Sequence, residues 1–408
     1  MNSKRLISII LAALLLASST VACGKKKKPA PGGGGGGNAL IPTQTDTVLP
    51  NEQTPTDEPE VPEQGITDPE QQGEITEPEV PEQQTPPESL YINKLTGLPT
   101  TEQLSNQRPV AIMFNNIKAA LPQHGIADMD VVYEAIVEGS ITRLLGVTTN
   151  WQALTTLGSI RSSRDYYIDF SDAHNAIYIH AGGSDIAYGV LSQRKTDNID
   201  GVNGNAADSK AFYRDQARRK KGVSLEHTMF TTGERLTQAI ADNKFNTTLK
   251  DGFVSPLKFA DTATDIGGEN ATYVYVPFST YAQSYFDYNT ETGVYDKGQY
   301  VSSKSSLDKH DSPHIDGNTN AQLAFENIVI IYTSYRTIDD KGRQAVNFTG
   351  SGDGYYFSDG KGKKIKWERA SRTGGYTLYE ADGTTELLMN KGKTYIGVVK
   401  NGTEITYK

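Results

Sequence analysis

The sequence predicts an α+β protein in which an N-terminal α/β layered domain precedes a smaller, β-rich and mostly antiparallel domain. Three observations lead to this prediction. Apolar, strand-like runs alternate with helix-like segments between Arg108 and Asn243. After about Gly252, short strand-like runs are separated by turn signals such as Asp-Gly and Asn-Gly. Before Ser89 the chain is too polar and too rich in Pro and Gly to bury a core.

Residues 1–22 are typical of a bacterial secretion signal. Lys4 and Arg5 precede an apolar run, Leu6–Ala17, that is too short to span a bilayer and ends in small residues. The sequence Thr-Val-Ala-Cys-Gly that ends this segment resembles a lipobox, with Thr20 where Leu is usual. The resemblance implies that Cys23 is lipidated and becomes the mature N-terminus. An ordinary signal peptide that happens to contain a cysteine is the alternative.

Residues 23–88 are expected to form a disordered tether behind the lipidated Cys23. A run of glycines and repeated Pro-Glu units cannot bury a core, and the tract Pro29–Glu88 contains 13 acidic residues and no Lys or Arg. Together with the six basic residues of 1–28, these acids carry a charge of −7 out of the total of −9, so residues 89–408 carry only −2. A near-neutral folded part argues against nucleic-acid binding, which needs a basic face. Because Cys23 is the only cysteine, disulfides and Cys-based zinc sites are excluded.

The N-terminal domain is predicted to occupy residues 89–250. The apolar runs predict strands at 109–114, 142–148, 158–161 and 176–180, and a strand or a short helix at 130–137. The intervening segments predict helices at 164–173, 185–193 and 232–243.

The C-terminal domain is predicted to occupy residues 251–408. Its strands are expected at 273–277, 283–288, 293–301, 327–332, 355–357, 365–367, 376–379, 394–399 and 404–407. Short strands joined by turns are typical of antiparallel pairing.

An arginine-rich segment is the first candidate for a ligand site. A strand that ends near Arg161 would let Ser163 cap the following helix, with Arg164 and Asp165 at the start of that helix. Arginines beside a helix N-terminus suit a phosphate or a carboxylate. The structural alternative is that Arg161 and Arg164 pair with Asp165, Asp169 or Glu138.

A second strand-to-helix turn repeats this design. Gly182 and Gly183 would let the backbone approach a ligand closely, and Ser184 would cap the next helix. Turns of this kind lie where open α/β sheets bind ligands, and His180 and Arg143 are expected at the rim. The alternative is that the glycines only permit a tight turn.

The segment His310-Asp311-Ser312-Pro313-His314-Ile315-Asp316 is a weaker candidate for a metal site. His310, Asp311, His314 and Asp316 are residue types that bind zinc, but ligands so close in sequence rarely complete one tetrahedral site. A polar loop between strands is the favoured interpretation, so no metal is assigned.

No motif for a nucleotide, a dinucleotide cofactor or a hydrolase nucleophile is present: the sequence lacks a Walker lysine, GxGxxG and GxSxG. We therefore expect no cofactor and name no catalytic residue. A non-catalytic binding protein is favoured, and an envelope enzyme or anionic-ligand binder that uses the arginine-rich segment stays open as the alternative.

Several segments of the chain together carry a resemblance to a known family; they are NQRPVAIMFNN, VYEAIVEGSITRLLGV, GSIRSSRDYYID, AIYIHAGGSDIAY, TYVYVPFS, SPHIDGNT, GYYFSDGKGKKIKWER and NKGKTYIGVV. These segments resemble the YerB family of Gram-positive lipoproteins, which has a two-part domain of unknown function. The resemblance implies an α/β domain, a β-rich domain and attachment outside the cytoplasmic membrane, and it implies no activity. We expect a lipoprotein held by Cys23 on the extracytoplasmic face of the cell membrane, with a cell-wall polymer or an envelope protein as its partner.

Overall fold

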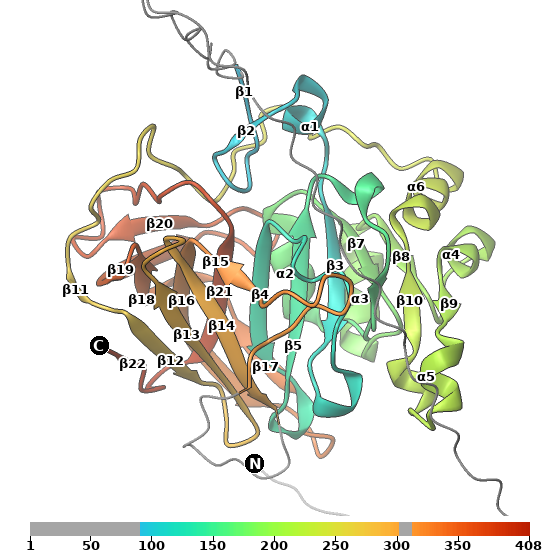
Figure 1. Ribbon diagram of the computed structural model, residues 1–408. Coiled ribbons are helices and arrows are strands. Elements are labelled where there is room, and N and C mark those ends of the chain that lie inside the picture. The colour runs from blue at the N-terminus through green and yellow to red at the C-terminus, as the bar shows by residue number, and fades with distance from the viewer. Residues whose placement is uncertain (1–89, 302–311) are drawn as a thin grey trace, which may run out of the picture. The chain divides into compact units, whose positions relative to one another are not determined.

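The computed structural model describes residues 90–301 and 312–408, all of which belong to one compact unit. Within these residues one mixed sheet of 12 strands runs through both halves of the sequence, in the order β11-β19-β18-β16-β21-β4-β5-β3-β7-β8, with β17 paired to β16 and β20 to β19 (Figure 1). The first half of the sequence contributes β3 (Val110–Asn115), β4 (Val131–Ile136), β5 (Thr142–Thr148), β7 (Ile177–His180) and β8 (Asn198–Asp200). The second half contributes β11 (Glu269–Asn270), β16 (Asn327–Thr337), β17 (Gln344–Asn347), β18 (Gly350–Ser358), β19 (Lys361–Arg369), β20 (Thr377–Glu380) and β21 (Thr394–Lys400).

Strand β21 joins the two halves of this sheet. It lies between β16 and β4 and is parallel to both, with Tyr395 opposite Ile328 on one side and Val132 on the other. In Figure 1 the red β21 lies beside the blue-green β4. Strands from both sides of the predicted domain boundary, between residues 250 and 251, share this sheet. The boundary itself stays a prediction.

Three smaller sheets complete the described strands. One has the order β15-β14-β13-β12-β22, another β6-β10-β9, and the third pairs β1 with β2. Their bounds are β1 (Tyr91–Ile92), β2 (Pro99–Thr100), β6 (Leu157–Gly158), β9 (Tyr213–Arg214), β10 (Met229–Thr231), β12 (Tyr273–Pro277), β13 (Ala282–Asn289), β14 (Val294–Val301), β15 (Ala324–Phe325) and β22 (Thr406–Tyr407).

The α-helices are short and lie between residues 102 and 242. They are α1 (Glu102–Asn106), α2 (Asp165–Ala173), α3 (Asp185–Arg194), α4 (Ala206–Ala211), α5 (Gln216–Lys220) and α6 (Gly233–Asp242). Five of them begin at a side-chain cap, and α2 is the exception; the caps are Thr101, Ser184, Asn205, Asp215 and Thr232. Among the helices of residues 90–301 and 312–408, none has the length and apolar character needed to cross a membrane.

The large sheet is covered on both faces, which explains why its central strands are apolar along their whole length. All six residues of β3 are buried. On β4, Val132 belongs to the same buried cluster as Phe286 of the five-stranded sheet. The next residue, Tyr133, points to the opposite face and stacks on Phe170 of α2 with ring centroids 4.9 Å apart. Side-chain alternation therefore builds one core on each face of the sheet.

The predicted fold class is confirmed, with two local differences. The segment 130–137 forms strand β4, so the helical alternative is wrong. The strand expected at 158–161 is shorter, because β6 ends at Gly158 and the following residues run as a loop to α2. The second half is mostly antiparallel as expected, and the parallel strand β21 is its exception.

Candidate functional site

Two neighbouring loops hold most of the predicted ligand-binding residues. One loop connects β6 to α2 and contains Arg161, Ser163 and Arg164, and the other connects β7 to α3 through residues 181–184. The amide of Ser163 donates to the carbonyl of Gly182 at 2.8 Å, and the amide of Ala181 donates to the carbonyl of Arg161 at 3.0 Å. These bonds fix the two loops side by side, so the two turns form one surface.

Three arginines meet at this surface, and we call Arg143, Arg161 and Arg164 the arginine cluster. Arg143 lies on β5 and is 5% exposed. Its Nη1 donates to the carbonyl of Ser162, while its buried Nε has no hydrogen-bond partner among the described residues. Burial, and then the positive charges of Arg164 and Arg161, lower the pKa of Arg143 to about 10. The cluster is thus a site of positive charge that the protein only partly compensates.

Two carboxylates offset the other two arginines. Arg164 binds Glu138 through both of its forked donors, Nε to Oε1 at 2.5 Å and Nη2 to Oε2 at 2.7 Å. Although burial opposes its ionisation, the bonds and charge of Arg164 hold the pKa of Glu138 below its usual value. Arg161 pairs with the more exposed Glu226 at 2.8 Å. The cluster therefore contains three guanidinium groups and two paired carboxylates.

Ser163 does not cap α2, contrary to the expectation from sequence. The N-cap residue is Arg164, whose backbone is extended and whose side chain makes no capping bond. The Ser163 hydroxyl is buried and instead accepts a hydrogen bond from the Tyr178 hydroxyl at 3.0 Å. Asp165, the first residue of α2, pairs with Arg372 of the second half of the chain at 2.9 Å.

His180 and the glycine turn make hydrogen bonds that stabilise the loop between β7 and α3. His180 is fully buried rather than at a rim, and its Nδ1 contacts the carbonyl of Gly182 at 2.8 Å. Gly182 has a φ of +80°, which favours glycine, and its amide donates to Asp200 at 2.7 Å. Gly183 pairs with Ser163 in a short parallel bridge. Ser184 caps α3 as expected, accepting from the amide of Ala187 at 3.1 Å.

The proposed metal-binding segment is only partly described. His310 and Asp311 lie outside the described residues. His314 is buried against Gln123 and Lys297, and Asp316 accepts hydrogen bonds from the backbone amides of Ala127 and Asn318. No group of three or more His, Cys, Asp or Glu side chains within residues 90–301 and 312–408 is arranged to hold a metal ion.

A buried polar network that sequence reasoning missed lies between the large sheet and the five-stranded sheet. We call it the Glu134 network. Glu134 on β4 is 1% exposed, and its carboxylate lies 3.7 Å from the Nζ of the fully buried Lys297 on β14. Hydroxyls of Thr142, Ser284 and Tyr395 donate to the same carboxylate at 2.6, 2.9 and 2.7 Å. A single Glu within the apolar run VVYEAIV was the available signal.

The network continues through Lys297. Its Nζ lies 3.1 Å from Nδ1 of His314, whose Nε2 lies 2.9 Å from Oε1 of Gln123. Burial lowers the pKa of Lys297 to about 8, although Glu134 opposes this shift. Burial and the charge of Lys297 also hold the pKa of His314 well below its usual value. This network links strands of both halves of the sequence through satisfied, closely packed polar groups.

Comparison with known proteins identifies relatives along most of the chain. Residues 95–246 match the family model described as the N-terminal domain of a protein of unknown function, DUF3048, and residues 274–396 match the C-terminal domain of the same family. The YerB protein of Bacillus subtilis (strain 168), named as a candidate lipoprotein, is 30% identical over 307 residues, covering 75% of this chain and 85% of YerB.

A crystal structure of YerB from Bacillus subtilis has the same fold. It superposes with a TM-score of 0.64 at 25% sequence identity and covers 77% of this chain and 99% of the YerB chain. The resemblance predicted from the sequence segments is therefore confirmed.

Proposed function

Because this chain belongs to the family defined by the DUF3048 N-terminal and C-terminal domains, we propose that it is a lipoprotein anchored through Cys23 whose head binds a ligand in the cell envelope. The lipobox-like sequence ending at Cys23 and the kinship with a candidate lipoprotein support the anchor. Two acyl chains on one cysteine give stable membrane attachment. The Pro/Gly/Glu-rich residues up to Glu88 then act as a tether on the extracytoplasmic face of the cytoplasmic membrane.

The arginine cluster supports the binding role. Its single strongest feature is the buried Arg143, which has an unpartnered Nε and has two other arginines nearby. Gathering like charges is costly unless an anion offsets them. An incoming phosphate or carboxylate would gain charge-assisted bonds from the more exposed Arg161 and Arg164 and would relieve Arg143. The ligand is therefore an anionic group, as found on cell-wall polymers, and the proposal assigns no reaction.

The anchor is tested by lipid labelling of the full-length chain in a bacterial host that processes lipoproteins. Wild-type protein should incorporate labelled palmitate and sediment with membranes, and Cys23→Ser should lose both properties because no other cysteine is present. Thr20→Leu, which restores the usual lipobox, is the matched control and should be labelled at least as well. Label that persists in Cys23→Ser would refute the anchor.

The binding site is tested by thermal denaturation of the full-length chain in detergent, with inorganic pyrophosphate and a poly(glycerol phosphate) as probes. A probe at 100 times its dissociation constant stabilises the folded state by about 2.7 kcal/mol. The shift should disappear in Arg161→Ala/Arg164→Ala and persist in Arg336→Ala, which removes an exposed arginine elsewhere. Equal shifts in all three proteins would place binding outside the arginine cluster.

A further inference from the structure

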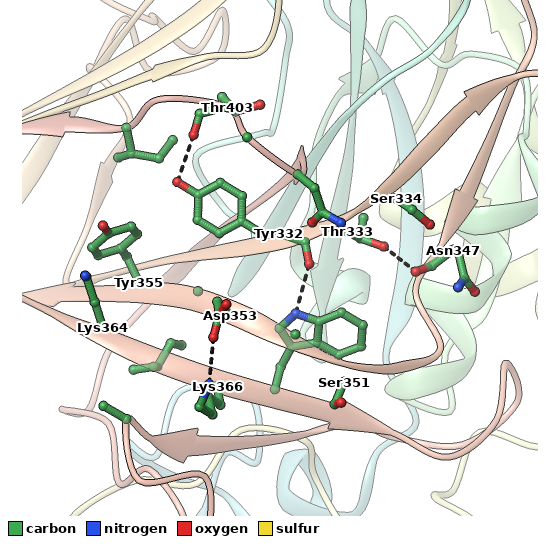
Figure 2. Close-up of a pocket in the computed structure, with 18 of the residues that line it drawn as sticks. Tyr332, Thr333, Ser334, Asn347, Ser351, Asp353, Tyr355, Lys364, Lys366 and Thr403 are labelled. Carbon is green, nitrogen blue, oxygen red and sulfur yellow. Dashed lines mark hydrogen bonds and ion pairs between the residues drawn. The ribbon is translucent and has the colours of Figure 1, made fainter.

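The large sheet opens into a fork in its C-terminal half. Strand β16 pairs with β18 from Asn327 to Ile331, and farther along it pairs with β17 from Ser334 to Thr337. Strand β18 instead continues along β19 to its start at Gly350. Where β16 and β18 separate, a groove of about 890 Å³ opens between them (Figure 2). This volume is within the range of small-molecule sites, roughly 300–1,000 Å³.

A packed tryptophan side chain forms the floor of the groove. The indole of Trp367 fills the fork and is 2% exposed, and its Nε1 donates to the carbonyl of Tyr332 at 3.0 Å. A Cβ at Gly352 would come within 2.6 Å of this indole nitrogen, so only glycine fits there. The backbone of β18 therefore packs closely on the indole of Trp367, and the indole lies between β18 and β16 where these strands separate.

Two tyrosines provide the apolar part of the lining. Tyr332 and Tyr355 are half-buried, with ring centroids 6.2 Å apart and planes inclined at 64°. The Tyr332 hydroxyl donates to the carbonyl of Thr403 at 2.9 Å, which fixes its ring across the groove (Figure 2). Burial raises the pKa of Tyr332 to about 12, so the ring is neutral. Fixed aromatic faces of this kind bind flat, weakly polar surfaces at low entropic cost.

Polar side chains surround these rings. Asn347, Ser334 and Ser351 are exposed at one end of the groove (Figure 2). Thr349 also lines it, and its buried hydroxyl has no hydrogen-bond partner among the described residues. Such a hydroxyl in a pocket wall is a bond available to a ligand.

The charges of the lining cancel. Lys364 and Lys366 oppose Asp353 and Glu404, and Lys366 already binds Asp353 at 2.8 Å. A strongly anionic or cationic ligand therefore gains little here, in contrast to the arginine cluster, with which the groove shares no residue. The lining suits an uncharged molecule that presents flat apolar faces together with many hydroxyl and amide groups.

We propose that this groove binds an uncharged glycan, with sugar rings packed on Tyr332 and Tyr355 and their hydroxyl or acetamido groups bonded to Asn347, Ser351 and Thr349. Choosing the glycan strands of the cell wall as its source depends on the proposed membrane anchor. The groove itself does not depend on the anchor or on the arginine cluster.

The test is calorimetric titration of the full-length chain in detergent with a tetrasaccharide of β-linked N-acetylglucosamine. Binding should saturate, and it should weaken at least about tenfold in Tyr355→Ala and in Asn347→Ala. Asn347 is exposed, so its replacement keeps the test valid if the tyrosine variant fails to fold. Tyr281→Ala, which removes a tyrosine that is 40% exposed outside the groove, should bind like wild type.

Arg161→Ala/Arg164→Ala separates this inference from the proposed function, because it should retain the tetrasaccharide and lose the anionic probes. Failure of wild-type protein to bind the tetrasaccharide, or equal binding by the groove variants, would overturn the glycan assignment and leave the anchor and the arginine cluster unaffected. Preference for an uncharged extended peptide over the tetrasaccharide would overturn it as well and would identify the fork as a peptide site.

Discussion

The arginine cluster and the Glu134 network are both charged and largely buried, but their charges are arranged in opposite ways. In the Glu134 network one carboxylate and one ammonium lie 3.7 Å apart, and three hydroxyl groups and the amide of Asn116 also donate to the carboxylate. In the arginine cluster three guanidinium groups share two carboxylates, and Arg143 has a nitrogen without a partner.

This contrast supports a structural role for the Glu134 network and the proposed binding role for the arginine cluster. A network whose charges balance offers no free charge to an ionic ligand and instead specifies how the sheets pack. An unbalanced cluster near the surface lowers its free energy when an anion arrives. The two regions should therefore respond oppositely to substitution: the network through stability and the cluster through affinity.

The largest effect is expected from Lys297→Met. It leaves the Glu134 carboxylate buried without its counter-charge, which costs about 3–5 kcal/mol of unfolding free energy. Urea denaturation of the full-length chain measures this loss. The double variant Lys297→Met/Glu134→Leu should lose less than the sum of the two single variants, because neither charge is left alone.

An exposed ion pair gives the baseline for this experiment. Lys258 and Glu386 have side chains that are 38% and 47% exposed, so Lys258→Met should change the unfolding free energy by less than about 1 kcal/mol. Equal losses in Lys297→Met and Lys258→Met would show that the Glu134 network contributes no more than a surface pair.

A pH dependence should arise from the same lysine. The folded-state pKa of Lys297 is lowered to about 8 from 10.5, so between these values the unfolded chain binds more protons. Stability from this residue therefore rises with pH across that window, by roughly 1.4 kcal/mol per unit at most. Urea midpoints between about pH 8 and pH 9.5, below the usual tyrosine range, should rise more in wild type than in Lys297→Met. Identical slopes would contradict the shift.

A smaller change in stability than at Lys297, but the most informative change in affinity, is expected at Glu138. Glu138→Gln leaves Arg164 without its bidentate partner and should cost about 1–2 kcal/mol, since both side chains are partly buried. It should also strengthen pyrophosphate binding, because the cluster gains net positive charge, whereas Arg143→Met should weaken it. Titration calorimetry compares the two variants, and changes of the same sign would argue against an electrostatic site.

The helices and strands predicted from the sequence are correct where the local residue pattern agrees with the burial of the element in the fold. The run TRLLGVT forms β5 over the predicted residues because every position is buried in a sheet covered on both faces. The helix expected at 164–173 begins one residue later, at Asp165. The pairing of β21 with β4 depends on residues more than 250 positions apart, and strand order at such separations leaves no periodic signal in the chain.

The arginine cluster was predictable in part, because two of its arginines belong to a turn that follows a strand in the sequence. Consecutive strand-to-helix turns do lie side by side, which brings Arg161 and Arg164 beside Gly182. Glu138 was among the partners considered for Arg164, but Asp165 instead binds Arg372 from the second half of the chain. Partners of this kind follow from tertiary packing, which the sequence pattern does not encode locally. The groove was missed because its tyrosines read as ordinary strand residues.

The central position of β21 determines when the large sheet can be completed. In chain order Thr394–Lys400 follow both strands with which they pair, β4 and β16, yet these residues fill the middle of the largest sheet. Until they emerge, β4 and β16 both have an unpaired edge, and unpaired edges recruit any other strand within reach. The interval between the emergence of Thr337 and that of Lys400 is therefore a time in which the incomplete fold is exposed to aggregation. A chain truncated before Thr394 loses the strand that connects its two halves.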